Sequence, residues 1–291
     1  MKKLLLILLI FAVATSFSQP KEEFDLYFNA IFSGNYPNAK KILLKIKREY
    51  PENVKTKLII ANYYSVLFET SGGEDKYYNI CKKYSDAAVT QLKKKKINTN
   101  NDVFRIISAK SILLKISVKK KEYLSAAKNM QSIIKYFEYA TEHQENERMK
   151  YISGMYNYYV ETAKEDYPII YPILLFYPSG NKKEGLNSLK ECTNSSDKKM
   201  QTRSLHQLAL IYYKDEKNAA LSKYYYKKLL KSYPKNLIWQ TEYLNALKKF
   251  NLIDDYQKQK KIIKNILIKN TFLTEKQKKY FLRKAEISQV Q

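Results

Sequence analysis

Hydrophobic residues recur at steps of three and four along most of the chain, which is the spacing of one face of an α-helix. Two clear examples are the series Ile106, Ala109, Leu113, Ile116 and the series Tyr123, Ala126, Met130, Ile133, Phe137. No segment alternates apolar and polar residues in the way that a half-buried strand requires. The pattern therefore predicts an all-α protein.

Short polar or glycine-containing stretches separate the predicted helices. They fall at residues 33–37, 71–73, 98–101, 119–122 and 193–197. Helices of ten to twenty residues with such short connections pack side by side in antiparallel order, so we expect about five or six helical hairpins. Residues 167–178 are apolar but contain three prolines, which predicts a packed crossover rather than a regular helix, with a dip into a membrane as the alternative.

The predicted hairpins share a repeated spacing. Ala39 is followed by Leu43 four residues later and by Pro51 twelve residues later, and Ser222 and Pro234 reproduce the twelve-residue step near the C-terminus. A small residue lets the two helices of a hairpin approach closely, and a proline ends the second helix. These positions predict where each hairpin packs most tightly and where it stops.

The repeat resembles the second half of a tetratricopeptide repeat, whose small residue, large residue and proline have these offsets. Residues 60–64 continue it into the next unit, and the Tyr-Pro-Glu-Asn sequence at 50–53 is echoed at 233–236. The repeat's tryptophan is missing, so the resemblance is to a degenerate form. It implies that residues 19–291 form one domain of antiparallel hairpins stacked as a TPR-like right-handed solenoid.

The first eighteen residues have the layout of a secretory signal peptide. Lys2 and Lys3 precede the apolar run Leu4–Ala14, and small residues lead to an expected cleavage after Ser18. The apolar run is well short of the ~20 residues that a spanning helix needs. The sequence thus resembles an exported bacterial protein, and we expect a periplasmic or outer-envelope location.

The chain is strongly basic, with a formal net charge of +25. Of its 53 basic residues only five are arginine, whereas a nucleic-acid-binding surface favours arginine for bidentate contacts. We therefore expect no nucleic-acid partner. Codon composition alone would produce much of the lysine excess; the alternative is a preference for an acidic partner, such as a polyanionic envelope polymer or an anionic membrane surface.

The residues that carry out most catalysis and metal binding are sparse. The only histidines, His143 and His206, are far apart, and with six glycines the chain has no nucleophile elbow or phosphate loop. Cys81 and Cys192 each lie in a helix-like stretch, where a buried thiol is the ordinary role, although a disulfide stays possible in an oxidising compartment. We expect no catalytic residue, no metal site and no cofactor.

The resemblance implies a concave groove lined by the first helix of each hairpin. In that register six polar residues are candidates for binding a protein or peptide partner: Lys55, Asn62, Ser65, Asn245, Lys248 and Lys249. We expect a non-catalytic exported scaffold that binds a protein or peptide, which could be acidic. The alternative is a basic envelope protein that docks on anionic lipid or polymer without a specific peptide ligand.

Overall fold

The computed structural model describes residues 21–94, 96–166 and 179–287. These residues form α-helices joined by short loops, with no strand among them, so the expected all-α fold of neighbouring helical pairs is confirmed. The predicted signal peptide at residues 1–18 and the predicted crossover at 167–178 lie outside the described residues.

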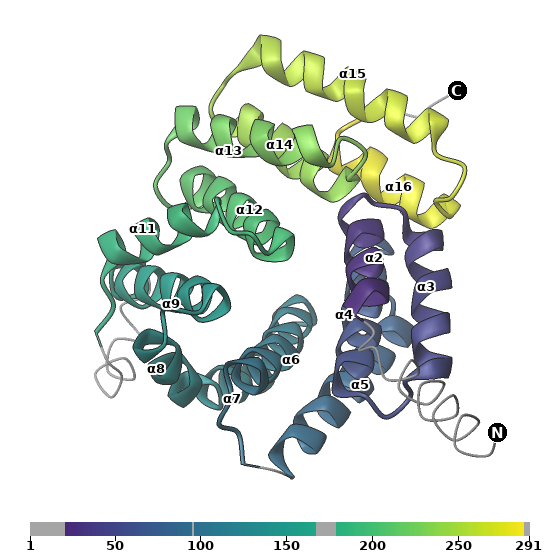
Figure 1. The fold of residues 1–291 in the computed structure, drawn as a ribbon. Coiled ribbons are helices and arrows are strands. Elements are labelled where there is room, and N and C mark those ends of the chain that lie inside the picture. The colour runs from purple at the N-terminus through teal and green to yellow at the C-terminus, as the bar shows by residue number, and fades with distance from the viewer. Residues whose placement is uncertain (1–20, 95, 167–178, 288–291) are drawn as a thin grey trace, which may run out of the picture.

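The helices follow one another around the molecule in chain order (Figure 1). They are α2 (Lys21–Phe32), α3 (Tyr36–Glu49), α4 (Val54–Thr70), α5 (Asp75–Lys93), α6 (Asn100–Lys119), α7 (Tyr123–Gln131), α8 (Ile134–Glu142), α9 (Glu147–Asp166), α11 (Lys182–Cys192), α12 (Lys198–Lys214), α13 (Ala219–Ser232), α14 (Leu237–Lys249), α15 (Ile253–Lys269) and α16 (Glu275–Lys284). Within the described ranges no helix combines the length and apolar character that crossing a membrane requires.

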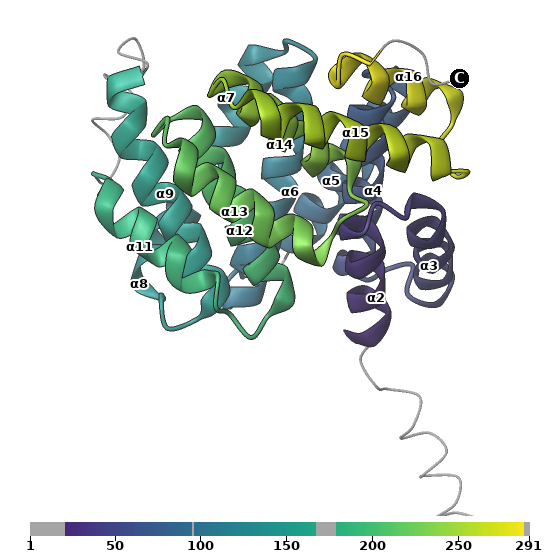
Figure 2. The ribbon, with the colours of Figure 1, turned by 90° about the horizontal axis from the view of Figure 1, so that it is seen from above.

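The hairpins form a closed ring rather than an array with two free ends. Figure 1 shows α4, α6, α9 and α12 toward the middle and α3, α11, α13 and α15 toward the outside. In both views α16 lies beside α4 (Figure 2). The ring therefore brings α16, the last described helix, against α4, near the start of the described chain.

One hydrophobic cluster closes the ring. It joins residues of α2 to α4, such as Phe24 and Ile59, to residues of α14 to α16, such as Leu244 and Phe281. Hydrogen bonds cross the same seam: Asn236 Nδ2 donates to the Phe32 carbonyl oxygen at 2.9 Å, and Gln277 Nε2 donates to Thr70 Oγ1 at 3.0 Å. Apolar burial thus holds the two ends, and these bonds satisfy polar groups at the seam.

The two Tyr-Pro-x-Asn sequences fold in the same way. Tyr50 ends α3 and Tyr233 ends α13 with nearly equal backbone angles, φ −133° with ψ 56° and φ −133° with ψ 62°. The asparagine that follows, Asn53 or Asn236, then caps the next helix by accepting a backbone N–H. The sequence echo is therefore a repeated helix–turn–helix connection.

The structure corrects the expectation of one continuous helix from Tyr123 to Phe137. The chain turns at Ser132 and Ile133, which separates α7 from α8. Tyr123 and Met130 are 65% and 38% exposed, whereas Ile133 is buried in a cluster with α6 and α9. The break turns α8 so that its apolar side packs against those helices, and no proline or glycine marks it in the sequence.

The contact between α2 and α3 provides a test of the repeat register. Ala39 is fully buried in the core cluster, and Lys40 is exposed. We expect Ala39→Leu to lower the free energy of unfolding by ~1–3 kcal/mol because added methylenes overfill a packed site. Lys40→Leu is the matched control and should change it by less than ~0.5 kcal/mol. Equal shifts of the two melting temperatures would contradict the register.

Candidate functional site

A large cavity lies inside the ring. It measures about 1590 Å³ and is lined by residues of α2, α4, α6, α7, α8, α9 and α12. Pockets for drug-sized ligands usually measure ~300–1,000 Å³. The cavity is therefore large enough for an elongated or bulky ligand.

Most of the cavity wall is apolar. On one side it consists of side chains that also belong to the buried core, including Ile107, Ile152, Tyr156 and Val160. Val118, Leu124 and Met130 line it as exposed apolar residues. Apolar side chains that face an open space rather than one another are characteristic of a site that a ligand covers.

Positive charge is concentrated at one part of this wall. Five cationic side chains from four helices line the cavity there: Lys55, Arg105, Arg148, Lys199 and Arg203. Three of them are arginines, in a chain that has only five. The carboxylates that pair with members of this group are Asp25, Asp102 and Asp197.

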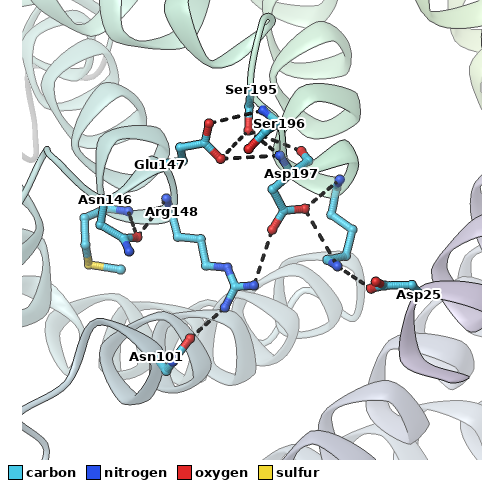
Figure 3. A network of polar contacts seen from close by, with 10 residues as sticks. Asp25, Asn101, Asn146, Glu147, Arg148, Ser195, Ser196 and Asp197 are labelled. Atoms are coloured by element: carbon cyan, nitrogen blue, oxygen red, sulfur yellow. Dashed lines mark hydrogen bonds and ion pairs between the residues drawn. The ribbon is translucent and has the colours of Figure 1, made fainter. Parts of the chain in front are cut away.

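A polar network holds part of this group in place (Figure 3). Arg148, in the first turn of α9, donates to Asn101 Oδ1 at 2.7 Å and to Asp197 Oδ2 at 3.3 Å. Lys199 pairs with Asp197 and with Asp25 of α2. Burial by itself raises the pKa of a carboxyl group, but Lys199 and Arg148 more than offset it and lower the pKa of Asp197. The carboxylate is thus a fixed anchor between two cations.

Glu147 positions the neighbouring Arg148. Its carboxylate accepts hydrogen bonds from Ser195 Oγ at 2.7 Å and from the Ser196 backbone N–H at 3.2 Å (Figure 3). The bond from Ser195 is the largest cause of the lowered pKa of Glu147, and the Ser196 backbone contributes. These bonds hold the start of α9 against the loop that precedes α12, which fixes the distance between Arg148 and the α12 cations.

Arg203 lies over aromatic rings instead of a carboxylate. Its guanidinium carbon is 5.4 Å from the centre of the Phe104 ring and 5.8 Å from that of Phe28, and Arg148 is also 5.4 Å from Phe104. Within the described residues no ion pair or hydrogen bond engages Arg203. Burial lowers the pKa of Arg203, but an arginine stays charged at neutral pH because its ordinary pKa is so high.

Lys55 is the second cation with no ion pair in the described part of the chain. Its Nζ lies 5.6 Å from the centre of the Phe24 ring. Burial is the largest cause of its lowered pKa, and repulsion from three neighbours adds to it: Arg105, Arg148 and Lys199. The cavity therefore carries more positive than negative charge at this end.

Three of the six candidate partner-binding residues line the cavity, namely Lys55, Asn62 and Ser65. Asn62 Oδ1 lies 3.1 Å from the Tyr27 hydroxyl, and Ser65 Oγ donates to the Asn62 carbonyl oxygen at 2.8 Å. Asn62 therefore helps to join α2 and α4 as well as forming the wall, whereas the Ser65 hydroxyl is bonded within its own helix, α4. Of the three, Lys55 has the polar group most free to meet a ligand.

The other three candidates lie away from the cavity. Asn245 is half-buried on α14, Lys248 is exposed and pairs with Glu286, and Lys249 donates to the carbonyl oxygens of Tyr213 and Lys214. The α14 helix contributes no residue to the cavity lining, because the inner wall at this point of the ring is made by α12. The structure thus does not bring these three residues together with Lys55, Asn62 and Ser65.

The histidines and cysteines also lie outside the cavity lining. His206 Nε2 is 2.6 Å from Glu242 Oε2, which links α12 to α14, and His143 stacks on Tyr139. Cys81 and Cys192 are free, buried thiols, and burial raises the pKa of each, to about 12 and about 11. No group of three or more metal-binding side chains occurs among the residues that the structure describes.

The arginines of the cavity are the residues that the sequence reasoning missed. Arginine is rare in the sequence, but Arg105, Arg148 and Arg203 lie on three separate helices with no shared motif. The available signal was their rarity in a lysine-rich chain, because each arginine then stands out against the background composition.

No protein-family model matches the chain, and no curated protein matches it.

Proposed function

We propose that this chain is an exported, non-catalytic helical-repeat protein of the cell envelope that binds its partner inside the ring. The observation that carries the proposal is the cavity of about 1590 Å³, with an apolar wall and a group of cations at one end. Large concave sites with apolar walls and a few convergent polar groups are the usual place for ligands. The export and the envelope location rest on the signal-like layout of residues 1–18.

A binding role suits the chemistry of the wall. Its described residues include no histidine or cysteine, the side chains that most often act as a base or nucleophile near neutral pH. Its one acidic residue, Asp25, is paired with Lys199. The charged groups are thus arranged to attract an anion rather than to transfer a proton.

The sequence leaves two partner classes open, a protein or peptide segment and an anionic lipid or polymer. Either could enter the cavity, since Lys55 and the arginines attract carboxylates and phosphates alike. Docking through the outer surface alone would leave the apolar wall of the cavity without a partner. A ligand inside the ring is therefore the form of binding that we propose.

A co-purification experiment tests the proposal. The full-length gene product would be isolated from the envelope without denaturation and examined by native mass spectrometry, where we expect a chain that begins at Gln19 and carries a bound ligand. Ser111→Trp adds a large side chain to the cavity wall on α6 and should reduce the bound fraction. Asn187→Trp adds the same side chain at an exposed position on α11 outside the cavity, so this control should leave the bound fraction unchanged.

Two results would overturn the proposal. One is a protein that carries no ligand and binds no apolar fluorescent probe. The other is an equal bound fraction in the Ser111→Trp and Asn187→Trp variants. If binding to envelope extract is equal in both variants and falls steeply with salt, then charge on the outer surface holds the partner.

A further inference from the structure

The cavity has two chemically different ends. Arg105 and Val118 both line it from α6, thirteen residues apart, which is about 20 Å along the helix at a rise of 1.5 Å per residue. The cations described above gather near Arg105, at the start of α6. Val118 lies at the other end of α6, where Leu124 at the start of α7 also lines the cavity as an exposed apolar side chain. The α7 helix runs back along α6, with Asn129 bonded to Lys110, so the exposed Met130 lines the cavity near the middle of α6.

The charge at the cationic end is not fully balanced. Asp25, Asp102 and Asp197 pair with Arg105, Arg148 and Lys199, and the described residues supply no ion pair for Arg203 or Lys55. These two cations therefore leave a surplus of positive charge at this end of the cavity.

Two further lysines line the cavity toward its apolar end, and they differ from this group. Lys115 is neutralised by Glu69 at 2.6 Å. Lys128 of α7 is exposed, so water screens its charge. Positive charge that is half-buried and has no ion pair therefore occurs at the Arg203 end of the described cavity wall and not at the apolar end.

The type of cation also carries information. If composition alone decided the cations, nearly all of those that line the cavity should be lysines. Instead, three of the five arginines in the chain line it. A guanidinium stacks on an aromatic ring and still offers two parallel N–H groups to a carboxylate or phosphate. Arg148 and Arg203 both lie over Phe104. The terminal N–H groups of Arg148 already donate to Asn101 and Asp197, so Arg203 is the arginine whose N–H groups remain for a ligand.

We propose that the cavity holds an anionic amphiphile with a long acyl chain. Its carboxylate or phosphate head group would lie against Arg203 and Lys55, next to Arg148, and its chain would extend along α6 past Met130 toward Val118 and Leu124. The inference rests on the proposed function and names the ligand class of that same cavity. An acidic peptide fits less well, because its backbone N–H and C=O groups would lose water against the apolar wall and find few partners there.

The binding test uses four probes on the purified protein: hexadecanoate, hexadecyl phosphate, hexadecanol and octanoate. We expect both anions with long chains to bind and hexadecanol to bind roughly tenfold to a hundredfold more weakly, since its neutral hydroxyl has no negative charge to pair with the cations. Octanoate should also bind weakly, because each buried methylene raises affinity about fourfold, the equivalent of ~0.8 kcal/mol. The ratio of the two long-chain anions identifies the head group, carboxylate or phosphate.

Two substitutions locate the head group. Arg203→Gln should weaken hexadecanoate roughly tenfold to a hundredfold and leave hexadecanol nearly unchanged, and Arg203→Lys should fall between, because lysine keeps the charge but not the fork of N–H groups. Arg48→Gln is the control. Arg48 is an 80% exposed arginine on α3, outside the cavity, and its loss should not change any affinity.

Several outcomes would overturn this inference without removing the proposed function. Equal affinities for hexadecanol and hexadecanoate would show that no head group is recognised. An acidic peptide that binds where hexadecanoate does not would assign the cavity to a protein segment. If Arg203→Gln does not fold, the comparison of hexadecanol with hexadecanoate on the unaltered protein still shows whether the cavity recognises an anionic head group.

A cavity that binds none of these probes and carries no ligand from the envelope would contradict the proposed function itself.

Discussion

Phe281→Ala should lower the melting temperature of the protein by roughly 6–20 °C, whereas Phe272→Ala should lower it very little. Phe281 is fully buried in the cluster that closes the ring, and Phe272 is 63% exposed in the loop before α16. Truncation of a buried phenylalanine costs ~3–5 kcal/mol, because apolar contacts are lost and a cavity remains. For a chain of this size each kcal/mol corresponds to ~2–4 °C.

Hydrogen exchange distinguishes a loosened α16 from an opened ring. Since the Phe281 cluster also contains Phe24 and Tyr27 of α2, Phe281→Ala should accelerate amide exchange in α2 and α16 together. Phe272→Ala should leave both helices protected. Faster exchange in α16 alone would mean that the two ends of the chain are not cooperatively coupled.

Gly185→Ala should destabilise the protein although the residue lies inside a helix. A Cβ on Gly185 would stand 2.6 Å from the Tyr158 backbone N and 2.8 Å from the Gly154 carbonyl oxygen. Both are backbone atoms of α9, so they cannot rotate away and the two helices must separate. We expect a loss of ~1–3 kcal/mol from overpacking, where an unhindered helical position would gain up to ~1 kcal/mol from the same change.

Asn187→Ala is the control for Gly185→Ala. Asn187 is exposed on the same helix, α11, and alanine favours helix more than asparagine does. Urea unfolding of the two variants should therefore give shifts of opposite sign. A stabilised Gly185→Ala variant would show that α9 and α11 do not approach each other so closely.

Local features of the fold could be predicted because neighbouring residues encode them. The breaks between hairpins, the proline-containing turns at Pro51 and Pro234 and the small buried Ala39 follow from turn chemistry, capping and helical spacing. The break between α7 and α8 could not, because the apolar spacing runs through Ser132 and Ile133 without a turn signal. Tertiary packing decides that position.

The site was only partly predictable for a related reason. The repeat register assigns a groove face to individual helices, and this is enough to point to Lys55, Asn62 and Ser65. It carries no information on how the hairpins curve around each other, so it does not separate α4, which lines the cavity, from α14, which does not. The meeting of Arg105, Arg148 and Arg203 depends on that curvature as well.

The closed ring also has a consequence for the order of folding. The hydrogen bonds across its seam join residues 204 and 207 positions apart, and contacts at such separations form slowly, because a long loop must close first. A chain is synthesised from its N-terminus, so α2 and α3 emerge with an apolar face whose cover, α14 to α16, is not yet made. Until then that face can associate with other chains. Successful folding thus depends on shielding the earliest part of the protein until its latest part arrives.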